Sequence, residues 1–240
     1  MEFYDNCISL GCFCGTAAAM EKHGLRSHSG PFDWYFSDFD SVLKVIETDF
    51  SDFMKKENLL ISESSQKEFC DTKYGFRCGH DIHGNFEKEY PLIYEKYMCR
   101  AEQFMKDVQS PTCFIRTVKS DREVRFIKEN KEYIYQVLRK GNANNEIVFL
   151  LRNGLTELPD DFLWFRLNID QYIGKTYEMR YMFDSSKSLL EYCQKILSPE
   201  TMERNRKFDR KHMRMGSRIS ILANKLKRRI FFSEAKGSAS

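Results

Sequence analysis

Two cysteines beside a predicted helix start have the residue type and setting for nucleophilic chemistry. Cys12 and Cys14 follow an apolar run that ends at Leu10, and good helix formers occupy residues 16–22. Gly11 permits a sharp turn between the two elements. The unpaired N–H groups of a helix N-terminus favour an anion, which would lower the pKa of either thiol. The alternative interpretation is that both cysteines are small core residues.

A cysteine nucleophile needs a base, and two histidines lie in one polar stretch of the chain. Residues 60–90 are rich in serine and glycine, which predicts a long loop of the kind that often carries function. His80 and His83 lie in this stretch, and Asp81 follows His80. A histidine there can act as general base, and a carboxylate beside it can fix its tautomer. The alternative is a pair of solvated loop histidines.

Asp33 is a second candidate for the orienting carboxylate. It stands among aromatic residues in the segment 32–36. The sequence alone favours a different role slightly, in which this segment anchors the core and Asp33 caps the following turn.

The hydrophobic pattern predicts strands and helices that alternate along the chain. A continuous apolar run at 146–151 suits a parallel strand covered on both faces. The alternation predicts an α/β domain over residues 1–200, with a mainly parallel central sheet flanked by helices. Expected strands are 3–10, 113–116, 146–151 and 163–167, and expected helices are 16–22, 42–46, 90–108, 121–140 and 185–196.

Polar residues follow three of these predicted strands, where such sheets bind ligands. They are the segment 11–14 after the first strand, Arg116 and Thr117 after the second, and Arg152 after the third. Two arginines beside a thiol suit a ligand that carries a phosphate or a carboxylate. Surface ion pairs are the alternative role for each arginine.

Several short motifs of the first half of the chain stand out as a set. They are Ser9-Leu10-Gly11 with Cys14, Gly24-Leu25-Arg26, Gly30 to Trp34, Gly79-His80-Asp81, Arg100 to Phe104, and Phe114 to Thr117. The set resembles a bacterial family of unknown function predicted to be papain-like cysteine peptidases and, more distantly, a capsule-biosynthesis acetyltransferase that binds coenzyme A. The resemblance covers about the first half of the chain. The family tends to carry two arginines and then Arg-Phe on its middle helix, where this chain has Cys99-Arg100 and Gln103-Phe104.

The resemblance implies a thiol enzyme with Cys14 as nucleophile, His80 rather than His83 as base, and Asp33 or Asp81 as orienting carboxylate. The implied reaction is acyl transfer or hydrolysis in bacterial capsular or exopolysaccharide biosynthesis. A coenzyme A thioester is a candidate donor and a glycan a candidate acceptor. Backbone N–H groups of residues 11–15 could stabilise an oxyanion. The candidate substrate-binding residues are Ser9, Gly11, Arg26, Arg116, Thr117 and Arg152.

Two other functions stay open on the sequence. In one, the arginines hold a nucleotide or phosphate in a membrane-associated sugar transferase, and Cys14 is structural. In the other, the protein is a non-catalytic scaffold of a capsule-assembly complex.

The segment 201–240 differs in charge from the rest of the chain. From residue 204 onward it holds 12 Lys/Arg residues against only Asp209 and Glu234, whereas the whole chain has a net charge of +3. Its apolar residues recur at helical spacing, which predicts a basic amphipathic helix at an anionic membrane surface. The alternatives are a helix docked on the domain and nucleic-acid binding. Few aromatic residues stand among the charges, which counts against stacking on single-stranded nucleic acid. The apolar residues of this stripe are Ile219, Leu222, Ala223, Leu226 and Ile230.

Composition predicts a folded cytoplasmic protein. Hydrophobic residues make up 42% of the chain and aromatic residues 14%. There is no basic segment of a signal peptide and no apolar run of about 20 residues, the length that spans a membrane. We therefore expect reduced thiols and a location in the cytoplasm, with the basic tail at the inner face of the membrane. Neither Cys12-x-Cys14 nor the group Cys78, His80 and His83 completes a zinc ligand set, so no metal is expected.

Overall fold

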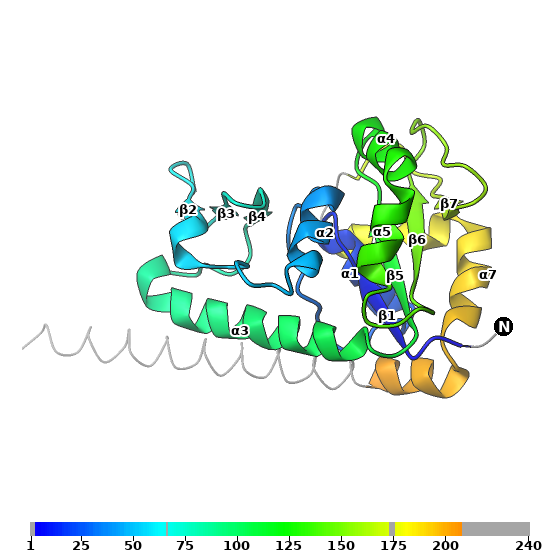
Figure 1. The fold of residues 1–240 in the computed structure, drawn as a ribbon, viewed down its shortest axis with the longest axis horizontal. Coiled ribbons are helices and arrows are strands. Elements are labelled where there is room, and N and C mark those ends of the chain that lie inside the picture. The colour runs from blue at the N-terminus through cyan, green and yellow to red at the C-terminus, as the bar shows by residue number, and fades with distance from the viewer. Residues whose placement is uncertain (1–2, 66, 173–175, 208–240) are drawn as a thin grey trace, which may run out of the picture.

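The centre of the molecule is a four-stranded parallel sheet (Figure 1). The computed structural model describes residues 3–65, 67–172 and 176–207. The strand order is β1-β5-β6-β7, so the first strand of the chain is an edge strand. The predicted α/β class with a mainly parallel sheet is confirmed. The strands are β1 (Asn6–Ser9), β5 (Thr112–Thr117), β6 (Glu146–Leu151) and β7 (Leu163–Arg166).

Helices cover both faces of this sheet, as the apolar run at β6 predicts. Ile147 and Phe149 pack into one hydrophobic cluster with α2, α3, α4 and α5, and Val148 and Leu150 into another with α1 and α7. The helices are α1 (Cys14–Lys22), α2 (Phe39–Glu47), α3 (Phe86–Asp107), α4 (Asp121–Glu129), α5 (Lys131–Leu138), α6 (Thr176–Met179) and α7 (Lys187–Ile196), with 3-10 turns at Lys56–Asn58 and Met182–Ser185 and a helical segment at 199–207.

The prediction of a long loop at residues 60–90 is wrong. This stretch folds into a small antiparallel sheet in the order β2-β3-β4, which lies beside α3 and away from the main sheet (Figure 1). Each strand is only three residues long, which is too short for hydrophobic periodicity to detect. Phe69 and Phe76 fix the sheet by packing into the aromatic core. The strands are β2 (Leu59–Ile61), β3 (Phe69–Asp71) and β4 (Phe76–Cys78).

The single helix expected at 121–140 is two helices, α4 and α5, separated at Asn130. The backbone of Asn130 leaves the helical region, with φ −124° and ψ 31°. Its side-chain Nδ2 donates to the carbonyl of Phe126 at 2.8 Å. Asparagine disfavours helix interiors because its side chain competes for such backbone groups. Apolar residues are buried on both sides of the break. They are Val124 and Ile127 before it and Ile134, Val137 and Leu138 after it.

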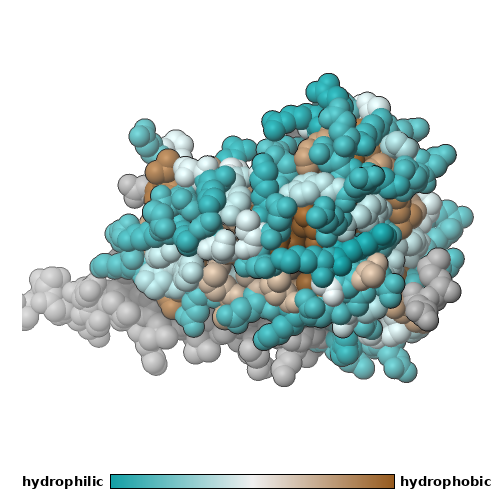
Figure 2. Space-filling model, viewed as in Figure 1, coloured by the Kyte–Doolittle hydropathy of each residue, from teal (hydrophilic) through white to brown (hydrophobic). Residues whose placement is uncertain are grey.

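The visible face of the molecule is mostly hydrophilic (Figure 2). Hydrophobic side chains show in a small recess near α2 and α5, lined by Ile46, Phe104 and Val137 among others. Within residues 3–207, no helix that the structure describes has the length and hydrophobicity to cross a membrane.

The helical segment 199–207 runs across residue 200, the predicted boundary of the tail. Met202 is buried, and Nδ2 of Asn205 donates to the carbonyl of Gly24 at 3.1 Å. These contacts join the segment to the α/β domain. The predicted amphipathic stripe from Ile219 to Ile230 lies outside the described residues.

Candidate active site

The turn between β1 and α1 places Cys14 at the carboxyl edge of the sheet. The backbone N–H of Gly11 donates to Oγ of Ser9 at 3.2 Å, and Gly11 adopts φ +83°, which glycine accepts readily. Oγ1 of Thr16 lies 3.1 Å from the carbonyl of Gly11 and 2.8 Å from Oγ1 of Thr117. These bonds tie the turn to β5. Cys14 is consequently the first residue of α1, where the helix dipole favours a thiolate.

His80 comes from the small sheet and meets Cys14 there. It follows β4 by two residues, and its side chain forms a hydrogen bond with the Cys14 side chain. This bond is the main cause that raises the pKa of His80 above its ordinary value of 6.5. The ring of Trp34 lies edge-on to the His80 ring, with centroids 5.7 Å apart. The structure thus brings a thiol and an imidazole together from two different sheets.

One short segment, residues 34–37, forms backbone hydrogen bonds close to both His80 and Cys14 in the chain. Phe36 and Arg77 exchange backbone hydrogen bonds of 2.9 and 3.1 Å, which attach the segment to β4 just before His80. The N–H of Ser37 donates to the carbonyl of Cys12 at 3.1 Å, which attaches it to the turn before Cys14. The separation of thiol and imidazole therefore depends on this segment.

The two candidate carboxylates make their hydrogen bonds to other groups. Asp33 is buried and accepts from Nη1 of Arg26 at 2.7 Å and from the N–H of Gly30 at 2.8 Å. Asp81 accepts from the hydroxyl of Tyr97 at 2.6 Å and from Lys96, both on α3. Asp81 raises the pKa of His80 through its charge, as a smaller cause than Cys14.

The candidate arginines hold protein groups. Arg116 is fully buried: Nε donates to Glu123 at 2.7 Å, and Nη1 and Nη2 donate to the carbonyls of Leu10 and Ser37 at 2.6 and 2.8 Å. Arg152 donates through Nη1 to the carbonyls of Asn153 and Asp170.

Of the remaining candidates, Ser9, Gly11 and Thr117 shape the turn before Cys14, whereas Arg26 follows the far end of α1. Ser9, Arg26 and Thr117 are buried, and Gly11 is held against Ser37, whose Oγ would lie 2.8 Å from any Cβ at that position. His83 is exposed, and its backbone N–H donates to Glu89 at 2.8 Å.

Burial distinguishes the two thiols that the sequence left equivalent. Cys12 is buried, and this burial raises its pKa to about 12. Its thiol consequently stays protonated at neutral pH. Cys14 is only half-buried, so it has the access that a nucleophile needs.

Two contributors, Trp34 and Ser37, were not among the expected site residues. Trp34 belongs to the Gly-Pro-Phe-Asp-Trp motif, so the sequence did mark its segment. Ser37 acts through its backbone N–H and carbonyl. Backbone groups of this kind have no signal in a sequence.

The contact between Cys14 and His80 predicts how the pKa of His80 changes when the thiol is removed. In the Cys14→Ala variant, the pKa of His80 is expected to fall, because the hydrogen bond and the thiolate charge that raise it are both removed while burial still lowers it. The imidazolium of the native protein therefore persists to higher pH than that of the variant. Titration of the His80 ring carbons by NMR measures both values. An unchanged pKa would contradict the contact.

Comparisons with other proteins found a matching family and a relative. The profile of a family described as "Putative papain-like cysteine peptidase (DUF1796)" matches residues 5–152, which include both Cys14 and His80. The protein "Uncharacterized protein R408" of Acanthamoeba polyphaga mimivirus is 31% identical over 163 residues, 59% of this chain and 73% of the relative. This relative is viral, whereas the sequence motifs suggested bacterial ones. No solved structure matches the chain significantly.

Proposed function

The chain belongs to the family described as "Putative papain-like cysteine peptidase (DUF1796)", and from this membership we propose a thiol-dependent hydrolase with Cys14 as nucleophile and His80 as general base. The observation that carries the proposal is that the Cys14 side chain, at the first turn of α1, is the main cause that raises the pKa of His80. A thiolate beside an imidazolium is the activated form of a cysteine nucleophile.

The proposed reaction proceeds through a thioester. The Cys14 sulfur attacks the carbonyl carbon of the substrate, and the His80 imidazolium gives its proton to the leaving group. Backbone N–H groups at the start of α1 favour the negative charge on the carbonyl oxygen. Water then attacks the thioester with His80 as base, which releases the acid and restores the thiol. Asp81 supports the charged imidazole electrostatically.

The finer assignments from the sequence stay predictions. They are acyl transfer in place of hydrolysis, a coenzyme A thioester as donor, a glycan acceptor in cell-surface polysaccharide assembly, and association with an anionic membrane. The sugar-transferase alternative receives less support, because Arg116 is buried and paired with Glu123.

A reactivity and turnover experiment tests the proposal. Iodoacetamide at neutral pH is expected to modify Cys14 fastest among the cysteines, which peptide mass spectrometry measures. In a screen of peptide and acyl thioester substrates, Cys14→Ala is expected to lose turnover by about 1000-fold or more, as loss of a nucleophile does. Cys12→Ala is the matched control, since that thiol is two residues away and buried. Turnover that survives in Cys14→Ala would exclude this mechanism.

A further inference from the structure

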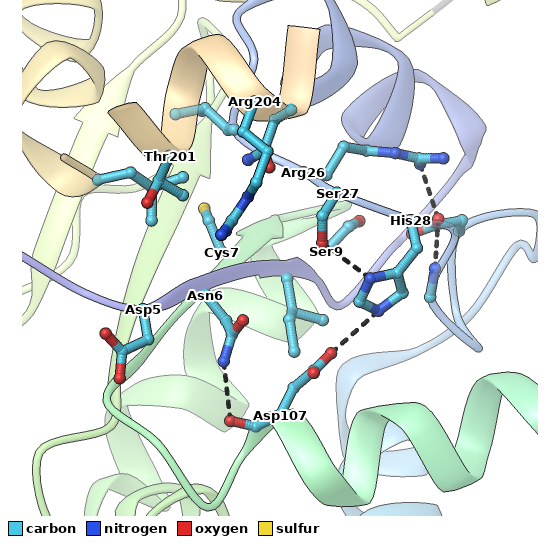
Figure 3. Close-up of a pocket in the computed structure, with 16 residues that line it drawn as sticks. Asp5, Asn6, Cys7, Ser9, Arg26, Ser27, His28, Asp107, Thr201 and Arg204 are labelled. Atoms are coloured by element: carbon cyan, nitrogen blue, oxygen red, sulfur yellow. Dashed lines mark hydrogen bonds and ion pairs between the residues drawn. The ribbon is translucent and has the colours of Figure 1, made fainter. Parts of the chain in front are cut away.

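A serine, a histidine and an aspartate stand in line at the other end of α1 (Figure 3). Oγ of Ser27 lies 2.8 Å from Nδ1 of His28. Nε2 of His28 lies 2.9 Å from Oδ2 of Asp107, the last residue of α3. The loop after α1 supplies the first two residues. With nine residues, α1 is about 13 Å long at 1.5 Å per residue, which separates this cluster from Cys14 at its start.

The cluster lies between a cavity and an open cleft. The cavity along the free edge of β1 has a volume of about 20 Å³, which is room for about one water molecule. The cleft between α3 and the segment 199–207 has a volume of about 440 Å³. Ser27 and His28 line both spaces, and both side chains are partly exposed. A ligand in the cleft can therefore reach the Ser27 hydroxyl.

Asp107 is fixed in place by bonds to its backbone and to one carboxylate oxygen: Oδ1 accepts from Nε2 of Gln103 at 2.8 Å, which leaves Oδ2 to face His28. Its backbone carbonyl accepts from Nδ2 of Asn6 and from Oγ1 of Thr112, each at 3.0 Å. Oδ2 is buried and lies 2.9 Å from Nε2 of His28, a contact that becomes an ion pair when the imidazole takes up a proton. The side chain of Asp107 is only 10% exposed, which strengthens that pairing.

The cleft beside Ser27 is positively charged. Arg100 and Arg204 both line it. Nη1 of Arg100 is buried without a hydrogen-bond partner in the part of the chain that the structure describes, and Arg204 reaches from the helical segment toward β1 in Figure 3. Two arginine side chains in the lining favour a ligand that carries a negative charge.

We propose that Ser27 and His28 form a second catalytic site, a serine esterase site for small esters that carry a carboxylate or phosphate group. His28 accepts the Ser27 proton at Nδ1, and Asp107 is a positioning residue that holds the Nε2–H tautomer. The Ser27 oxygen bonds to the ester carbonyl carbon, and the alcohol leaves with the proton from His28. Water then attacks the acyl-serine and gives a proton to His28, the bond between the acyl carbon and the Ser27 oxygen breaks, and His28 returns the proton to that oxygen as the acid is released.

The test uses the full chain with Cys14→Ala as background, so that no product comes from the thiol. A fluorophosphonate probe is expected to label Ser27, as located by mass spectrometry. Hydrolysis of mono-4-nitrophenyl succinate is expected to fall at least about 100-fold in both Ser27→Ala and His28→Gln. Ser29→Ala is the matched control, because Ser29 lies in the same loop and bonds only Arg26 in the described structure.

Charge selection has its own readout. Arg100→Gln is expected to slow the succinate ester about 10-fold and to leave neutral 4-nitrophenyl acetate unchanged, since it removes one cation from the cleft. An unlabelled Ser27, or hydrolysis that is equal in background and Ser27→Ala protein, overturns the second site. Neither result bears on Cys14, which is absent from the background protein. Cooperative thermal unfolding of each variant shows that a loss of rate is not a loss of fold.

Discussion

Replacing His80 with glutamine is expected to slow alkylation of Cys14 about 100-fold at pH 6, because a cysteine without its imidazolium returns toward the ordinary pKa of about 8.5. At pH 6 an ordinary thiol is less than about 1% ionised, whereas a thiolate paired with His80 is largely formed. The direct bond between the two side chains is the structural reason. Alkylation quenched at successive times and followed by peptide mass spectrometry measures the alkylation rate of Cys14.

The pH dependence separates loss of the ion pair from a simple change of access. At pH 9 the same variant is expected to react within a few-fold of the native protein, since an ordinary thiol is then mostly ionised. His83→Gln is the control, because His83 is exposed in the same stretch and its hydrogen bond is made by the backbone. A deficit of equal size at pH 6 and pH 9 would mean that His80 only shapes the site.

Replacing Arg116 with methionine is expected to lower the free energy of unfolding by about 3–5 kcal/mol, the cost of breaking a buried ion pair from one side. The variant leaves Glu123 buried without its guanidinium partner and frees the carbonyls of Leu10 and Ser37. Methionine has a similar shape, so the change is mainly one of charge and hydrogen bonding. Urea denaturation followed by circular dichroism measures the difference.

Two further variants define the origin of this loss. Arg122→Met on the exposed side of α4 is expected to change stability by less than about 0.5 kcal/mol, as surface substitutions do. The double variant Arg116→Met with Glu123→Gln is expected to recover part of the loss, because the unpaired charge is gone. A cost below about 1 kcal/mol for Arg116→Met alone would show that the pair is not integral to the fold.

The main sheet was predictable from the sequence because one of its inner strands, β6, is a continuous apolar run. The run 146–151 carries this prediction, and the two clusters on either side of it confirm that both faces are covered. The small sheet was not predictable, because strands of three residues leave no period to read. The helix break at Asn130 was missed for a related reason: the apolar spacing continues across it.

The candidate site divides in the same way. Local sequence placed Cys14 at the first turn of a helix, and the structure has it there. Its contact with His80 is a tertiary contact, supported by the backbone bridge between Phe36 and Arg77 of β4. Burial of Cys12 and Arg116 likewise depends on the assembled core. Residue type suggested a ligand for Arg116, whereas the fold surrounds it with backbone carbonyls and Glu123.

The division of the site between two sheets has a consequence for the newborn chain. During synthesis Cys14 leaves the ribosome well before His80 exists, and the imidazole reaches it only after the small sheet has folded and docked through Phe36 and Arg77. Until then the thiol has the low reactivity of any cysteine. If Cys14 is the nucleophile that we propose, the chain therefore stays unreactive while it is unfolded and surrounded by other proteins, and its thiol is activated only when this tertiary contact forms.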